Sequence, residues 1–301
     1  MGNARLLILI SATLFASNSF AIIFGSDDRL ERYQLKDTAV FRAAESTAAL
    51  AYRSRFKSVP GNPGALEIDF TVNGNGRIIA DASCPSAFVG QPQLVSYCSS
   101  TLVGDDLLLT AGHCFERGPT VTKESVCEQT IALFDFAKRA PGDDPIRFAR
   151  EKIYECKAIE AYSAGTNLDF ALIRLDRKVV GRKPLRLSAV DSLKSGDRVL
   201  NSGYPKGRPN KTTLTGTYGR GLPDPSRALI NVTSEGGSSG SSILNPRTLE
   251  IVGVLVSSGC PDLEWDQRKE CYFEPTFSNQ CDGVTIVLSS VVRNAAGFLI
   301  P

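Results

Sequence analysis

A single histidine limits the acid–base chemistry that this chain can perform. His113 is the only histidine among 301 residues, and it stands in the run Thr110-Ala111-Gly112-His113-Cys114, directly after three leucines. A neutral imidazole can accept and return a proton near neutral pH. If the protein uses a histidine as a general base, it has only this one.

A glycine–serine run downstream supplies candidate nucleophiles. The run Gly236-Gly237-Ser238-Ser239-Gly240-Ser241-Ser242 precedes an apolar pair, Ile243-Leu244. A hydroxyl needs an adjacent base before it can attack a carbonyl, and glycines let consecutive N–H groups converge on the oxyanion that then develops. The same composition is typical of a flexible linker, but a linker rarely lies between two predicted strands.

Chain order decides between the two central serines. Ser238 is the centre of Gly236-x-Ser238-x-Gly240, the nucleophile-elbow pattern of α/β hydrolases. That fold needs its histidine after the serine, and no histidine follows His113. Ser239 is therefore the predicted nucleophile.

The third group required is an acid that holds the imidazole in one tautomer. Asp169 begins the apolar run Phe170-Ala171-Leu172-Ile173, which favours a shielded position. Asp176 is an alternative, but it ends a charged stretch where we expect it to be solvated. Asp105 and Asp106 would satisfy only the order acid, histidine, serine of subtilisin, and nothing around them resembles that site.

The first residues have the features of a secretory signal. Arg5 precedes an apolar stretch at 6–16, which is too short to span a bilayer, and Ser19-Phe20-Ala21 offers small residues for cleavage. We expect a signal peptide of residues 1–21, followed by an N-terminal segment, 22–45, that is either a pro-segment or part of the mature fold. No later segment is apolar enough to span a membrane. The net charge of +2 argues against nucleic acid or an anionic membrane as the main partner.

Eight cysteines, an even number, predict four disulfides in an exported chain. Their spacing does not fit a zinc site, because there is no CxxC pair and only one histidine, so we expect neither a metal nor a cofactor. A Cys98–Cys114 bond would close a short loop. The other six cysteines allow many pairings, of which we favour Cys127–Cys156, with Cys84 bonded to one of Cys260, Cys271 and Cys281.

Short apolar runs separated by glycine, proline, asparagine and aspartate recur along the chain from Cys98 onward, and few windows have a helical period. This pattern predicts an all-β barrel or sandwich. Before it we expect a strand at 46–52 and a hairpin around Asn73-Gly74-Asn75-Gly76. The one expected helix is Ser289–Ala296. A weak boundary at 178–188 divides the chain into a half with His113 and Asp169, residues 46–185, and a half with Ser239, residues 186–301.

Taken together, three segments resemble the signatures of chymotrypsin-like serine proteases: Thr110-Ala111-Gly112-His113-Cys114, Asp169-Phe170-Ala171-Leu172 and Gly237-Ser238-Ser239-Gly240-Ser241. The serine run, the early Gly25-Ser26-Asp27-Asp28-Arg29 and Gly203-Tyr204-Pro205 are similar to the bacterial glutamyl-endopeptidase branch. The resemblance covers residues 22–301 apart from an unusual insertion at 57–97.

The resemblance implies two six-stranded antiparallel β-barrels with the site in the cleft between them. It makes His113 the general base, Asp169 the residue that orients it, and Ser239 the nucleophile. The N–H groups of Gly237 and Ser239 would form the oxyanion hole, and a Cys98–Cys114 disulfide would brace the histidine.

The chain departs from the family at two positions that bear on specificity and activation. Ser238 stands where many relatives have an aspartate that pairs with a new N-terminal amine, so that mode of activation is in doubt. Leu255 stands where glutamyl endopeptidases have a second histidine, so acidic specificity is not supported. Glu235 could instead favour a basic side chain. The resemblance places these further residues beside the substrate: Ser234, Glu235, Leu255, Ser257 and Ser258.

The sequence therefore predicts a monomeric secreted or periplasmic serine endopeptidase that cleaves a protein or peptide substrate through an acyl-enzyme. One alternative is an inactive relative that acts as a binding or adhesion module, which would bind a protein partner tightly without turnover. Another is an esterase with the same triad, which a comparison of ester and amide substrates would distinguish.

Overall fold

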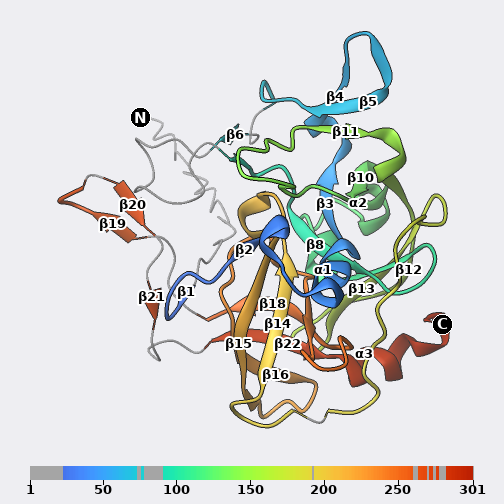
Figure 1. Ribbon diagram of the computed structural model, residues 1–301. Helices are drawn as coiled ribbons and strands as arrows, with labels where there is room; N and C mark the ends of the chain where they lie inside the picture. The colour runs from blue at the N-terminus through green and yellow to red at the C-terminus, as the bar shows by residue number, and fades with distance from the viewer. Residues whose placement is uncertain are drawn as a thin grey trace, which may run out of the picture.

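The apolar runs of the first half form a closed antiparallel barrel (Figure 1). This computed structural model describes residues 23–72, 76–77, 91–191, 193–259, 264–269, 271–273, 276–277 and 283–300. Neighbouring strands of the barrel follow the order β10-β12-β13-β9-β8-β3. Their bounds are β3 (Thr47–Tyr52), β8 (Cys98–Leu102), β9 (Leu107–Thr110), β10 (Thr130–Leu133), β12 (Ile153–Ala164) and β13 (Asp169–Leu175).

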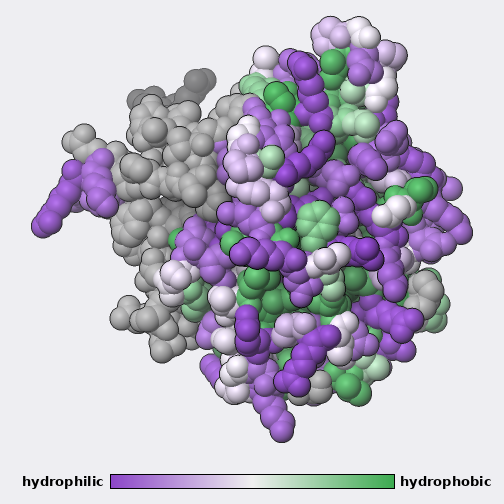
Figure 2. All heavy atoms as spheres, viewed as in Figure 1, coloured by the Kyte–Doolittle hydropathy of each residue, from purple (hydrophilic) through white to green (hydrophobic). Residues whose placement is uncertain are grey.

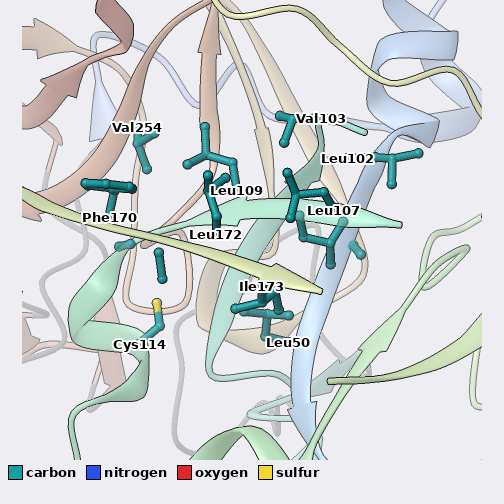
Figure 3. Close-up of a cluster of buried hydrophobic side chains, with 14 of the residues drawn as sticks. Leu50, Leu102, Val103, Leu107, Leu109, Cys114, Phe170, Leu172, Ile173 and Val254 are labelled. Atoms are coloured by element: carbon teal, nitrogen blue, oxygen red, sulfur yellow. The ribbon is translucent and has the colours of Figure 1, made fainter. Parts of the chain in front are cut away.

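The two strands that carry the candidate histidine and acid are apolar along almost their whole length. Every residue of β9 is buried, as are all but one of β13, and Leu109 pairs with Leu172 in the ladder between them. Figure 3 shows Leu109, Leu172 and Ile173 gathered in one buried cluster. Strands buried on both faces read as continuous apolar runs rather than as an alternation, which explains the three leucines before the histidine.

The second half forms another closed barrel, in the lower part of Figure 1. Its order is β14-β17-β18-β22-β16-β15, and a further pairing of β14 with β15 closes the ring. The strands are β14 (Arg198–Gly203), β15 (Lys211–Gly221), β16 (Arg227–Asn231), β17 (Ser242–Leu244), β18 (Ile251–Ser258) and β22 (Val284–Leu288). The prediction of two six-stranded antiparallel barrels is confirmed.

One hydrophobic cluster joins the barrels. Leu109 and Phe170 of the first barrel belong to the same buried cluster as Val254 and Val287 of the second. Figure 3 shows Val254 close to Phe170 and Leu109. Val292, on α3 (Ser289–Ala296), adds to this cluster, and the predicted C-terminal helix has the bounds that we expected.

The expectation of a single helix is wrong, because two more helices precede barrel strands. The first is α1 (Thr38–Glu45), where Asp37 caps the helix by accepting hydrogen bonds from the N–H groups of Ala39 and Val40. The second is α2 (Lys123–Gln129), where Thr122 accepts from the N–H of Ser125. Both helices are only about two turns long, too short for a helical period to stand out.

Several short strands lie outside the barrels. Within and after the predicted insertion, β4 (Phe56–Val59), β5 (Asn62–Ile68) and β11 (Arg147–Ala149) form a three-stranded sheet. The turn expected at Asn73-Gly74-Asn75-Gly76 lies outside the described residues except for Gly76, so the hairpin stays a prediction. The first described strands are β1 (Ile23–Phe24), which pairs with β21 (Thr276–Phe277), and β2 (Leu30–Glu31), which extends the second barrel beside β15. The remaining pairs are β6 (Gly76–Arg77) with β7 (Pro92–Gln93) and β19 (Glu264–Asp266) with β20 (Cys271–Phe273).

Two disulfides cross-link the first barrel. Cys98 is bonded to Cys114 and Cys127 to Cys156, as predicted. The second bond ties α2 to β12. Cys84 lies outside the described residues, so its expected pairing stays a prediction.

The face of the molecule that Figure 2 presents is mainly hydrophilic, with hydrophobic side chains interspersed. Among the described residues, no helix combines the length and the apolar character that crossing a membrane requires.

Candidate active site

A short turn after β9 holds His113 in place. Thr110 ends the strand, and Gly112–Phe115 forms a single 3-10 turn, which we call the histidine turn. A Cβ on Gly112 would lie 1.9 Å from the carbonyl oxygen of Ser163, so no larger residue fits there. The next residue after His113 is bonded to β8 through the Cys98–Cys114 disulfide. The backbone on both sides of the imidazole is therefore fixed.

Asp169 binds His113 through both carboxylate oxygens. Its Oδ2 lies 2.7 Å from the imidazole Nδ1, and its Oδ1 accepts the backbone N–H of the same histidine at 2.9 Å. The Asp169 side chain is 12% exposed and that of His113 is 34% exposed. Because an ionised carboxylate only accepts hydrogen bonds, Nδ1 carries the proton and Nε2 is left as the basic nitrogen.

The competing aspartates are occupied elsewhere. Asp176 accepts the N–H of Glu155 at 2.9 Å and pairs with Arg177. Asp106 pairs with Arg174, and Asp105 pairs with Lys178. Among the described acids, Asp169 is the one whose hydrogen bonds reach the histidine.

The glycine–serine run packs against the histidine turn. We call residues 235–241, between β16 and β17, the serine loop. The carbonyl oxygen of Ser239 accepts the N–H of Ser99 at 2.8 Å and lies 3.9 Å from the Cys114 sulfur. A Cβ on Gly240 would lie 2.1 Å from Thr110 Oγ1 and 2.9 Å from the nitrogen of Ala111. The loop therefore meets the strand end that leads into His113.

Hydrogen bonds to their carbonyl oxygens fix the orientation of two peptide groups in the serine loop, Gly236–Gly237 and Ser238–Ser239. The carbonyl oxygen of Gly236 accepts the N–H of Lys206 at 2.5 Å, and that of Ser238 accepts the N–H of Ser241 at 2.9 Å. In a trans peptide the N–H points opposite to the carbonyl, so the N–H groups of Gly237 and Ser239 point away from these donors. Within the described part of the chain, neither of these two N–H groups donates a hydrogen bond. They are available to a negatively charged oxygen.

A left-handed backbone at Gly237 makes this arrangement possible. Its φ is +92°, a conformation that glycine adopts readily. A Cβ there would meet the carbonyl oxygen of Tyr204 at 2.7 Å. Burial raises the pKa of Tyr204, whose hydroxyl donates to the carbonyl of Thr47 at 3.1 Å. The buried tyrosine thus packs against the loop and leaves room only for glycine at position 237.

Glu235 points into the protein. Its side chain is 0% exposed and forms ion pairs with Arg29 and Arg208. The Nζ of Lys206 lies 3.6 Å from the same carboxylate. This carboxylate is therefore neutralised internally, and it offers no open charge to a basic substrate side chain.

The other predicted substrate-binding residues divide into buried and open positions. Leu255 belongs to the core of the second barrel, and its backbone pairs with Ser241 and Gly240. Ser234 is also buried. Ser257 is exposed and Ser258 is partly exposed, both at the end of β18.

Sequence analysis missed Ser99, which aligns the serine loop. The backbone N–H of Ser99 donates to the Ser239 carbonyl, as described above. The Oγ of Ser99 donates to the carbonyl of Gly237 at 2.8 Å and accepts the N–H of Tyr204 at 2.9 Å. Its only sequence signal is its place next to Cys98. The role depends on long-range contacts that no local pattern indicates.

Three described residues with metal-ligating atoms meet at the histidine, but these three do not form a metal ligand set. Ligand atoms of Cys98, His113 and Cys114 lie within 4.8 Å of one another, but the two sulfurs are joined in a disulfide. A disulfide sulfur is not the thiolate that metals bind.

Comparison with known proteins agrees with the fold. The family model described as a trypsin-like peptidase domain matches residues 98–254, more than half of the chain. The protein therefore belongs to the trypsin-like peptidase family, which confirms the resemblance to chymotrypsin-like proteases. The glutamyl-endopeptidase branch stays a prediction. No curated protein matches the sequence significantly.

Solved structures with the same fold are distant in sequence. A serine endoprotease of Yersinia pestis has a TM-score of 0.50 and 14% identity, over 87% of this chain and 65% of its own. The VesB protease of Vibrio cholerae has a TM-score of 0.46 and 15% identity, over 83% of this chain and 62% of its own. A Glu endopeptidase has a TM-score of 0.48 and 15% identity, over 92% and 95%. The chain thus spans less than two thirds of the length of the first two proteins.

Proposed function

We propose that the protein is a serine endopeptidase whose catalytic triad is His113, Asp169 and Ser239. The observation that carries the proposal is the pair of hydrogen bonds from His113 to Asp169, made at a turn against which the serine loop packs. Membership of the trypsin-like peptidase family supports hydrolysis of peptide bonds.

The geometry supports a two-step acyl transfer. Ser239 Oγ attacks the scissile carbonyl carbon while its proton passes to Nε2 of His113. The carbonyl oxygen becomes an oxyanion that the N–H groups of Gly237 and Ser239 stabilise. His113 then gives the proton to the leaving amine, and the peptide bond breaks to form the acyl-enzyme. Water, deprotonated by His113, hydrolyses the ester and restores the serine.

The surroundings of the triad support a route for the substrate. Strand β18 continues past the residues that pair with β17, and its last residues are the exposed Ser257 and the partly exposed Ser258. We propose that the substrate backbone lies along this last part of β18. Ser234 and Leu255 would form the wall behind it. We assign no preferred substrate side chain, because Glu235 is paired internally.

We further propose that the enzyme acts outside the cytoplasm as a monomer. The two disulfides support an oxidising compartment. The signal-like features of residues 1–21 agree with export. We also propose that the chain divides near residue 185 into two domains, one for each barrel.

Turnover of a mixed peptide library by the secreted protein tests the proposal. We expect cleavage of internal amide bonds by the wild type and loss of about 10⁶-fold in Ser239→Ala. Ser290→Ala, on α3, is the matched control and should retain full activity. Cleavage of esters without amides would indicate the esterase alternative. Equal turnover by Ser239→Ala and the wild type would contradict the assignment.

A further inference from the structure

A buried cluster of charges lies directly behind the serine loop. Glu235 accepts hydrogen bonds from Nη1 of Arg29 and, at 2.9 Å, from Nη1 of Arg208. The side chains of Arg29, Arg208 and Glu235 are 2%, 5% and 0% exposed. None of the proposed catalytic steps uses these three groups.

Glu235 is the first residue of the turn that carries the oxyanion donors. The N–H of Ser238 donates to the Glu235 carbonyl at 2.9 Å, and the N–H of Glu235 donates to Ser238 Oγ at 3.2 Å. These bonds close a turn around Gly236 and Gly237. The backbone of Glu235 is therefore one end of the turn that contains the Gly237 N–H, and its buried side chain ties that end to the ion cluster.

The Glu235 carboxylate is also linked to the Gly236 carbonyl, through Lys206. Lys206, whose Nζ lies 3.6 Å from Glu235, donates its backbone N–H to the carbonyl of Gly236. The cluster is thus linked to both ends of the Gly236–Gly237 peptide. A shift of the carboxylate would turn the carbonyl, and with it the N–H that faces the oxyanion.

Arg29 comes from the N-terminal segment, far from the loop in sequence. Asp27 holds its guanidinium through Nε at 2.8 Å and Nη2 at 2.7 Å, which orients Nη1 toward Glu235. Asp28 anchors the same segment by accepting a hydrogen bond from Thr215 Oγ1. The following strand, β2, pairs with β15. The segment is therefore held so that it delivers one cation to the serine loop.

Removal of one partner from a buried ion cluster leaves a charge that is poorly compensated and no longer solvated by water. Without Arg29, the carboxylate of Glu235 keeps only Arg208 and the more distant Lys206 among the cations just named. We expect it to rotate toward solvent and to carry the turn with it. Such a change would disorder the oxyanion donors while leaving the His113–Asp169 pair intact.

We propose that Arg29 is a positioning residue: by binding Glu235 it makes the N-terminal segment a structural part of the oxyanion hole. The inference rests on the proposed function. It also implies that cutting the chain after Arg29, so that the segment can leave, would switch the enzyme off without touching the triad.

Steady-state kinetics of Arg29→Met test the proposal, because methionine keeps much of the side-chain volume and removes the charge. We expect kcat to fall about 10²-fold, the effect of losing one oxyanion donor, with KM changed by less than about threefold. Arg29→Lys keeps the charge without the planar fork and should recover part of kcat. The matched control is Arg32→Met, the same substitution at another buried arginine of the N-terminal segment, which pairs with Asp135 and not with Glu235. It should leave kcat within about twofold.

Equal kcat values in Arg29→Met and Arg32→Met, with both proteins folded by near-ultraviolet circular dichroism, would overturn the proposal. If Arg29→Met does not fold, Arg29→Lys is compared with Arg32→Lys in the same way. Hydrogen exchange of the peptide containing residues 235–241 gives a readout independent of turnover: it should be faster in the Arg29 variant than in the control. An inactive wild type would contradict the proposed function, whereas unchanged exchange would contradict the positioning role.

Discussion

Replacement of Asp169 by asparagine tests how the acid controls the histidine. Asp169 accepts two hydrogen bonds from His113, one from the backbone N–H and one from Nδ1. Asparagine has one acceptor oxygen and one donor nitrogen. The backbone N–H can pair only with the oxygen, so the amide NH₂ must face Nδ1. The imidazole then carries its proton on Nε2 and cannot accept one from Ser239.

The size of the effect follows from the geometry. An imidazolium and a carboxylate whose charge centres lie about 4 Å apart attract each other by about 4 kcal/mol at an effective dielectric constant of about 20. The Asp169→Asn variant loses this attraction for the imidazolium formed in the transition state. Forcing the wrong tautomer costs about a further 1 to 1.5 kcal/mol, the value of one hydrogen bond. The sum, about 5.5 kcal/mol, corresponds to a loss in kcat of about 10⁴-fold.

The assay is cleavage of the best library peptide, with kcat and KM measured separately. Because the amide has the same shape as the carboxylate, we expect KM and the melting temperature to stay close to the wild-type values. Asp176→Asn is the matched control: Asp176 directly follows β13, bonds to Glu155 rather than His113, and should retain kcat. A loss of less than about tenfold in Asp169→Asn would refute the role of Asp169.

Three further predictions concern a glycine of the serine loop, a buried lysine and the disulfide beside the histidine. Gly240→Ala should destabilise the protein by about 3 kcal/mol or more in urea unfolding, because φ is +83° and the new Cβ would lie 2.1 Å from Thr110 Oγ1. Burial lowers the pKa of Lys211 to about 8 from the ordinary 10.5, so the unfolded chain binds more protons between these values. The free energy of unfolding should therefore rise by about 2 kcal/mol more in the wild type than in Lys211→Met between about pH 7.5 and about pH 9.5. Replacing Cys98 and Cys114 together by serine should cost about 3 kcal/mol of stability and also lower kcat, because this bond fixes the histidine turn.

Each of these changes has a control and an outcome that would contradict it. Gly142 has φ +79° and open space where a Cβ would lie, so Gly142→Ala should lower the free energy of unfolding only by the conformational cost of about 1 to 2 kcal/mol. An equally small decrease in Gly240→Ala would rule out the steric argument. If the free energy of unfolding changed equally with pH in the wild type and in Lys211→Met, the pKa of Lys211 would not be lowered by folding. Removal of Cys127–Cys156 should lower stability but leave kcat unchanged. Equal effects on kcat from both disulfides would contradict a specific brace at the histidine.

Local patterns were sufficient for the barrel strands. The three leucines before the histidine motif lie in β9, and Asp169, at the head of an apolar run, is the first residue of β13. This part of the prediction succeeds because buried strands have continuous apolar residues. The catalytic roles of His113 and Asp169 stay predictions. The Cys127–Cys156 bond was the favoured one of many pairings and is present.

Other parts of the structure depend on contacts between distant residues. Arg29 and Glu235 are 206 residues apart in sequence, and nothing local to either residue indicates the pairing. The sequence therefore left the direction of Glu235 open, although its burial decides whether a substrate can reach it. Helices α1 and α2 were missed for another reason: each is about two turns long, and only the caps at Asp37 and Thr122 mark them.

Covalent labelling by a fluorophosphonate, mapped by mass spectrometry, tests whether Ser239 is a nucleophile that His113 activates. The reagent reacts only with a serine whose hydroxyl is activated by a base, and its phosphoryl oxygen occupies the oxyanion hole. We expect one label per folded molecule on Ser239, lost in His113→Ala as well as in Ser239→Ala. No label on folded wild-type protein, or a label on Ser238 instead, would contradict it.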